Sequence, residues 1–170
     1  MPIGESRKEF MNFEKPSKIE QTSGNKERLL ALEKQEKFVF HGSPYAIDDL
    51  EPRQGYNYNE KTGQKEKDGN PAVFSTPFID VAIFRALINT EGVTGKSMSK
   101  FGIEGERLHF SATKNLVDQA KKKIGKIYVL DKLKFKDFEG TECRSEEKVI
   151  PIEVFEVTAE DLPENIKIKE

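Results

Sequence analysis

Short apolar runs recur along the chain and are separated by stretches rich in charged residues, glycine and asparagine. Runs of β-branched and aromatic residues predict strands, because such side chains suit a pleated, half-buried surface. The strands expected from this pattern are residues 38–40, 72–75, 107–111, 126–130 and 148–157, with a further short apolar piece at 135–138. The residues from His41 to Pro44 break the first strand, and Pro151 interrupts the last.

Apolar residues at helical spacing predict three helices. Leucines give an apolar face to a helix over residues 26–36, with Asn25 as its expected N-cap. A second helix opens at Thr76 or Pro77, and the third covers residues 115–123. The buried side of the second helix is formed by Val81, Ala82, Phe84 and Ala86. Short strands, few helices and no regular strand–helix alternation predict an α+β fold with a largely antiparallel sheet.

Three stretches are too polar to belong to a core. Residues 1–24 are interpreted as a polar N-terminal arm in front of a single domain over residues 25–170. Residues 53–71 form a long loop, of the kind that is either a functional lid or disordered, and residues 89–106 form a second, glycine-rich connection. Substrate recognition is expected on these two loops, because specificity usually resides on loops around a rigid scaffold.

Composition narrows the classes of function. The 170 residues fit one domain, and the 28 basic and 30 acidic residues give a net charge of -2. This balance favours a protein or a small molecule over nucleic acid as partner. No run of about eighteen apolar residues occurs, so no membrane span is expected. One cysteine, Cys143, fits a cytoplasmic protein of bacterial or phage origin, although a secreted toxin without its leader has the same features.

Several kinds of chemistry lack their sequence signatures. Two distant histidines and one cysteine do not have the spacing of a zinc site, so no metal is expected. The phosphate loop, the nucleophile elbow and the glycine-rich dinucleotide motif do not occur in the sequence.

Three short segments carry candidate chemistry. His41 follows an apolar strand and precedes Gly42, so its imidazole is placed to donate to a ribose hydroxyl while a ligand approaches the glycine backbone. Phe74 stands at a strand end before small hydroxyl residues and offers a stacking wall for a flat heterocycle, with Phe84 as a second wall or as core. Glu147 is placed to stabilise a developing oxocarbenium ion. Each segment alone also fits a purely structural role: a turn histidine, a core phenylalanine and a solvated acid.

The order of the three segments resembles the ADP-ribosyltransferase superfamily, above all its His-Tyr-Glu branch of diphtheria toxin-like and poly(ADP-ribose) polymerase-like proteins. The resemblance rests on the segments FHGS at 40–43, VFST at 73–76 and EKVIP at 147–151. It extends over about residues 38–157 and implies a split antiparallel β-sheet core with a few helices. It also implies NAD as substrate and transfer of ADP-ribose to an unidentified acceptor, with release of nicotinamide.

The resemblance implies a role for each matched residue. His41 would hold the nicotinamide ribose, the backbone of Gly42 would pair with the carboxamide, and Ser43 would bind a ribose hydroxyl. Phe74, with Phe84, would stack on the nicotinamide ring beside Ser75. Glu147 would stabilise the ribosyl cation, and Arg53 would bind a phosphate of NAD.

Two departures from the family pattern keep other interpretations open. Phe74 replaces the family tyrosine, and Ser145 stands where arginine-modifying members carry a second acid or a glutamine. The alternatives are a non-catalytic module that binds NAD or ADP-ribose, an RNA 2'-phosphotransferase-like enzyme, and a structural or phage-associated protein. For the second of these, Arg53 and Arg85 are the available phosphate ligands.

Overall fold

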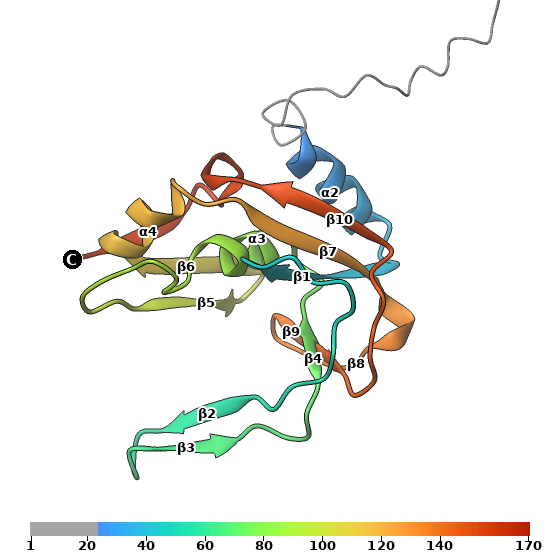
Figure 1. The fold of residues 1–170 in the computed structure, drawn as a ribbon, viewed down its shortest axis with the longest axis horizontal. Coiled ribbons are helices and arrows are strands. Elements are labelled where there is room, and N and C mark those ends of the chain that lie inside the picture. The colour runs from blue at the N-terminus through green and yellow to red at the C-terminus, as the bar shows by residue number, and fades with distance from the viewer. Residues whose placement is uncertain (1–23) are drawn as a thin grey trace, which may run out of the picture.

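A computed structural model of the chain describes residues 24–170, so the arm expected over residues 1–24 lies, apart from Gly24, outside the described residues. Within this range the chain has the expected α+β fold, with three α-helices and mostly antiparallel sheets (Figure 1). No helix in this part of the chain is long and apolar enough to cross a membrane.

The strands form three small sheets and a separate hairpin. The first sheet is antiparallel, with the order β1 (Phe38–Ser43), β7 (Gly125–Asp131), β10 (Glu153–Val157). The second has the order β11 (Ile166–Lys169), β6 (Arg107–Thr113), β5 (Ser99–Glu104), with β11 parallel to β6. The third has the order β4 (Val73–Ser75), β9 (Glu142–Ser145), β8 (Lys136–Glu139). The hairpin pairs β2 (Tyr56–Asn59) with β3 (Gln64–Lys67).

Helix α3 (Ile79–Leu87) lies between the first and second sheets and forms the centre of the main core (Figure 1). The expected buried side is confirmed, and Ile79, Ile83 and Leu87 are buried as well. A helix that is apolar on nearly every side must be enclosed by other elements. Helices α2 (Asn25–Lys34) and α4 (Lys114–Ala120) are more peripheral and bury fewer side chains.

Two glycines allow α3 to pack directly on the first sheet. A Cβ atom at Gly42 of β1 would lie 1.9 Å from the carbonyl oxygen of Ala82, and one at Gly125 of β7 would lie 2.7 Å from the Cβ atom of Ala86. Both distances are far below van der Waals contact, so no larger residue fits at either position without moving the helix.

A second core cluster lies between the first and third sheets. Its buried members are Val39, Leu50, Val73, Tyr128, Leu130, Phe135, Cys143 and Val149. Cys143 is fully buried here, and burial raises the pKa of its thiol to about 12. This cluster fixes the third sheet against β1 and β7.

Several expected boundaries are wrong. The first strand does not break at His41: β1 continues to Ser43, because His41 and Gly42 pair with Tyr128 and Ile127 of β7. The N-cap of α2 is Gly24, and the Asn25 side chain instead donates to the Glu156 carbonyl at 2.8 Å, which ties the helix to β10.

Both long connections contain strands. Residues 53–71 include the β2–β3 hairpin, whose alternation of tyrosine and asparagine is a period-two pattern without aliphatic residues. Residues 89–106 include β5, which turns into β6 at Gly105 with a φ of 64°. A Gly-X pair between two strands is a recognised hairpin signal, so this strand was readable from the sequence.

The strand expected over residues 148–157 is shorter than predicted, since β10 begins at Glu153. Before it, Val149 makes only an isolated bridge with Leu50, and Pro151 has no N–H to offer a ladder. The apolar piece at 135–138 corresponds to β8, while β9 and β11 were not expected at all. β9 reads Glu-Cys-Arg-Ser and carries no apolar pattern, whereas β11 reads Ile-Lys-Ile-Lys, an alternation that was readable from the sequence.

Candidate functional site

His41 lies where β1 and β4 separate. Phe40 and Thr76 form a bridge in which each N–H donates to the other's carbonyl, at 2.7 and 2.9 Å. Two residues further along, continued pairing would bring Gly42 opposite Phe74. Instead, the Nδ1 atom of His41 lies 2.7 Å from the Phe74 carbonyl oxygen. A carbonyl only accepts, so Nδ1–H donates and the lone pair of the neutral ring lies on Nε2.

The environment keeps the His41 ring neutral. Burial lowers the pKa of His41 and is the largest cause, the hydrogen bond to Phe74 opposes it, and the nearby charges of Arg85 and Arg53 lower it further. Nε2 is therefore an acceptor at neutral pH. The sequence-based expectation that this imidazole donates to a ribose hydroxyl is thus reversed: the hydroxyl would donate to the ring.

Gly42 presents its backbone to a cavity beside His41. Phe40 directs its N–H and C=O toward Thr76, and the same groups of Gly42, two residues later, face the same edge of β1. Gly42 lines a small cavity of about 10 Å³ together with His41, Phe74 and Arg85. The absence of a side chain at Gly42 is required by α3 on one face of the strand, not by a ligand.

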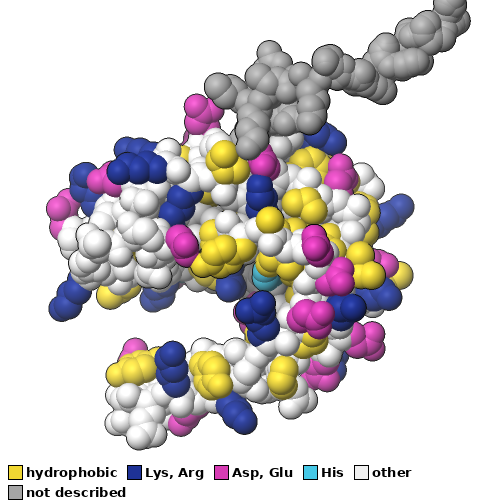
Figure 2. All heavy atoms as spheres, viewed as in Figure 1, with side chains coloured by type: hydrophobic (Ala, Val, Ile, Leu, Met, Phe, Trp, Pro, Cys, Tyr) yellow, Lys and Arg dark blue, Asp and Glu magenta, His cyan; other side chains and the backbone are white. Residues whose placement is uncertain are grey.

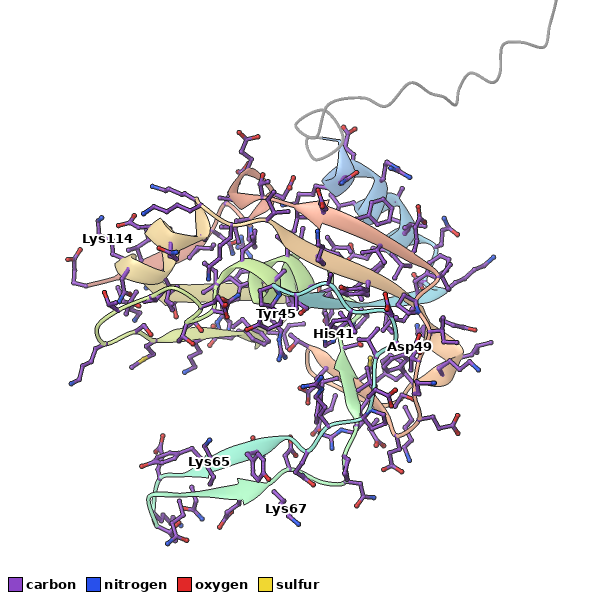
Figure 3. All side chains as sticks on the ribbon, in the orientation of Figure 1. His41, Tyr45, Asp49, Lys65, Lys67 and Lys114 are labelled. Atoms are coloured by element: carbon purple, nitrogen blue, oxygen red, sulfur yellow. The ribbon has the colours of Figure 1, made fainter. Side chains whose placement is uncertain are left out.

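A larger cleft of about 570 Å³ opens on the other side of His41. It is lined by His41, Ser43, Arg53, Phe74, Arg85 and residues 45–51 of the loop that follows β1. Figure 2 shows the molecule hollowed between its main body and the hairpin, and in Figure 3 His41 and Tyr45 lie along the side of the main body that faces this opening. His41, Phe74 and Arg85 border both cavities.

Two arginines, Arg53 and Arg85, line the cleft together with three acids, Asp48, Asp49 and Glu51. Within residues 24–170, neither Arg53 nor Arg85 forms a salt bridge. Arg85 is accessible to solvent yet surrounded by protein, as expected for a side chain in a cleft. Burial lowers the pKa of its guanidinium and the charge of Glu142 raises it, but an arginine remains cationic at neutral pH. The pair therefore forms a potential anion site.

The loop wall of the cleft is held by Tyr128. Its hydroxyl donates to the Tyr45 carbonyl at 2.7 Å and accepts from the Ile47 N–H at 2.6 Å. The Tyr45 N–H donates to the Ser43 Oγ atom at 3.0 Å, so the Ser43 hydroxyl keeps its own proton for a ligand. The wall also carries Asp49, which pairs with Lys148 at 3.6 Å.

Phe74 is half-buried, and charged side chains share its face of the third sheet. Arg144 pairs directly with Phe74 across β4 and β9, and its Cζ atom lies 4.9 Å from the ring centroid. Arg144 also reaches Glu142 at 3.6 Å and Asp68 at 3.5 Å. Glu142 lines the small cavity with His41 and Gly42, and its carboxylate is paired with Arg144.

Of the other expected site residues, Glu147 and Phe84 lie outside both cavities of His41, and Ser75 lines the small one. Glu147 is exposed and lines a separate cavity of about 320 Å³ with Lys134 and Lys136. Phe84 is buried in the main core against Phe101 and Phe110 and lines neither cavity of His41. It is therefore not available as a second stacking wall. Ser75 is buried in the small cavity, and its hydroxyl has no hydrogen-bond partner among the described residues.

Sequence reasoning missed Tyr128, Glu142 and Arg144 as residues of the site. Tyr128 stands in an apolar strand and gave no signal other than core. Glu142 and Arg144 precede the segment that carries the family resemblance, and only their strand pairing with β4 brings them to Phe74. Comparisons of the chain with protein-family models, curated proteins and solved structures found no significant match. The chemistry of the site is therefore inferred from its own residues.

Proposed function

We propose that the cleft binds NAD and that the protein transfers its ADP-ribose group to an acceptor, with release of nicotinamide. The observation that carries this proposal is the grouping of a neutral His41, the open backbone edge of Gly42 and two arginines without a described salt bridge, Arg53 and Arg85, around two neighbouring cavities. A volume of about 570 Å³ lies in the usual range for small-molecule and cofactor sites.

The nicotinamide, its ribose and the two phosphates of NAD find complementary groups. The nicotinamide carboxamide offers one donor and one acceptor to the C=O and N–H of Gly42. A hydroxyl of the nicotinamide ribose donates to Nε2 of His41, and the Ser43 hydroxyl donates to the same ribose. The two phosphates suit Arg53 and Arg85, because guanidinium groups bind phosphate through several parallel hydrogen bonds. The nicotinamide ring stacks on Phe74.

Entry of the nicotinamide requires one side chain to move. The cavity beside Gly42 is only about 10 Å³, and Arg85 borders both it and the cleft. When the Arg85 side chain turns toward the phosphates, the two cavities join and the ring reaches Gly42. This movement gives up the contact of the guanidinium with the Phe101 ring, whose centroid lies 5.8 Å from the Arg85 Cζ atom, so binding of the NAD phosphates would have to offset that loss.

The reaction breaks the bond between the ribose carbon and the nicotinamide nitrogen, and the bonding electrons leave with nicotinamide. The ribose carries positive charge in the transition state, which a carboxylate stabilises. Position favours Glu142 for this role, since it shares the small cavity with His41, whereas the resemblance implies Glu147. The acceptor nucleophile then bonds to the ribose carbon and loses its proton.

The separation of β1 from β4 beyond the Phe40–Thr76 bridge supports the finer assignment of the fold as the split sheet of an ADP-ribosyltransferase. A second candidate function is binding of NAD or ADP-ribose without turnover. It is favoured by the placement of Glu147 outside the cleft and by Phe74 in the position of the family tyrosine.

Nicotinamide release from NAD, with cell lysate as a source of acceptors, tests the proposal. We expect release by the wild-type protein and by Glu147→Gln, and a loss on the order of a hundredfold or more in Glu142→Gln. Loss in Glu147→Gln alone would return the catalytic role to that residue. If the wild type releases no nicotinamide yet binds NAD, the binding module is the correct interpretation.

A further inference from the structure

The β2–β3 hairpin extends away from the rest of the molecule as an arm (Figure 1). In its register Tyr56 is opposite Lys67, and Tyr58 is opposite Lys65. Residues directly opposite in an antiparallel pair share a face, and so do alternate residues of one strand. Tyr56, Tyr58, Lys65 and Lys67 therefore form one face of the arm, called here the Tyr–Lys face.

The Tyr–Lys face is exposed and carries only positive charge. The two tyrosines are 54% and 66% exposed, and the Nζ atom of Lys65 lies 6.0 Å from the centroid of the Tyr56 ring. Neither lysine forms a salt bridge with another described residue. The acid of the two strands, Glu66, lies on the opposite face, where it accepts a hydrogen bond from Asn59 at 2.9 Å.

Exposure of the Tyr–Lys face is unfavourable in free energy for an arm that has no binding partner. An isolated two-stranded hairpin is only marginally stable in water, and two exposed aromatic rings add no core. In Figure 2 the hairpin shows hydrophobic and basic side chains in alternation along its length. At its base the Asp68 N–H donates to the Gly55 carbonyl at 2.9 Å, which holds the arm at a fixed point beside Phe74.

We propose that the Tyr–Lys face binds single-stranded nucleic acid, with bases stacked on Tyr56 and Tyr58 and phosphates on Lys65 and Lys67. Aromatic rings interleaved with cations are how proteins bind single strands without sequence preference. The two rings are two residues apart on β2, about 7 Å, which is roughly twice the rise per nucleotide of a stacked strand. An acidic peptide would use the lysines but leave both rings without a partner.

The net charge of -2 does not oppose this interaction locally, because Glu66, the one acid of the hairpin strands, lies on the face opposite the Tyr–Lys face. Stacking and phosphate contacts do not involve the 2'-hydroxyl, so single-stranded DNA and RNA should bind alike. The proposal is independent of the proposed function, since the four residues lie outside both cavities of His41.

Fluorescence anisotropy with a labelled oligothymidylate of about 12 nucleotides tests the inference in the absence of NAD. We expect weak binding. The logarithm of the association constant should fall linearly with the logarithm of the salt concentration, with a slope of about -1.4, the value for two phosphate contacts on a single strand. Replacing both tyrosines by threonine keeps the β-propensity of the arm and should weaken binding on the order of tenfold for each ring. Lys65→Ala with Lys67→Ala should abolish the salt dependence.

The matched control is Lys121→Ala with Lys122→Ala, which removes the same charge just after α4 and should leave affinity unchanged. Circular dichroism establishes that each variant keeps the wild-type fold and thermal midpoint. Affinity that is equal in all variants, or no binding of oligothymidylate or oligouridylate at low salt, would overturn the proposal. So would binding of poly-glutamate in place of the oligonucleotides, which would identify an acidic protein as the partner.

Discussion

Replacing Gly42 by alanine should destabilise the protein strongly, although a glycine-to-alanine change in extended backbone normally stabilises a protein slightly. The usual gain of about 0.4–1 kcal/mol arises because alanine restricts the unfolded chain. Here the new Cβ atom would lie 1.9 Å from the Ala82 carbonyl oxygen, 2.8 Å from its carbonyl carbon and 3.1 Å from the Ala86 nitrogen. The obstacle is the backbone of α3, which no rotamer change can remove.

The size of the stability loss in Gly42→Ala follows from the steric overlap between the new Cβ atom and the backbone of α3. Relief of the clash requires α3 to move away from β1 by more than 1 Å, and this helix is buried on nearly every side. Overpacking of a core costs about 1–3 kcal/mol, and a backbone obstacle belongs at or above the upper end. For a domain of this size about 3 kcal/mol corresponds to a fall in Tm of roughly 6–12 °C.

Chemical denaturation followed by circular dichroism measures this change, with two matched variants. Gly24→Ala has no neighbour within 4 Å of its new Cβ atom, so it should cost only about 1 kcal/mol, the loss of a favourable N-cap residue in α2. Ala82→Gly should not rescue Gly42→Ala, because the clash is with the carbonyl group of residue 82 and not with its side chain. Wild-type stability of Gly42→Ala would refute the contact between α3 and β1.

Three further predictions concern the site and its surroundings. Tyr128→Phe leaves the Ile47 N–H and the Tyr45 carbonyl without their hydrogen-bond partner. The free energy of unfolding should therefore fall by about 1–3 kcal/mol, and NAD binding should weaken. Unchanged denaturation and NAD titration curves would contradict this prediction. The pKa of His41 is lower in the folded protein than in the unfolded chain, so the unfolded chain binds a proton first as the pH falls. The free energy of unfolding should therefore decrease as the pH falls from about 6.5 toward the pKa of folded His41. In His41→Asn the free energy of unfolding should fall less between pH 6.5 and 5.5 than in the wild type. If it falls equally in both proteins, His41 does not cause the pH dependence. The Cys143 thiol, with its pKa raised to about 12, should resist iodoacetamide at pH 8 until the protein unfolds, and rapid labelling of the native protein would place it at the surface.

The core elements were the most predictable part of the fold. The apolar residues of α3 and the aromatic and aliphatic runs of β1 and β7 carry signals that tertiary contacts reinforce. By contrast, β9 reads Glu-Cys-Arg-Ser, and its strand character comes from pairing with β4 rather than from its own composition. Such strands depend on long-range pairing that local patterns do not record.

The site was predictable in its types of residue but not in its geometry. His41, Phe74 and Arg53 were chosen from the sequence, and the fold places all three around one cleft. Which nitrogen of His41 carries the proton depends on the Phe74 carbonyl, 33 residues away in the chain. The choice between Glu142 and Glu147 stays a matter for experiment: Glu142 begins β9 and lines the small cavity, whereas Glu147 follows the end of β9 and lines a separate cavity.

NAD titration by isothermal calorimetry, of the wild type and of Arg53→Ala with Arg85→Ala, tests the central claim most directly. The site predicts one bound NAD per chain, with affinity reduced on the order of a hundredfold in the double variant and unchanged in Lys121→Ala with Lys122→Ala. No heat of binding at millimolar NAD, or equal affinity in all three proteins, would contradict the assignment of this cleft to NAD.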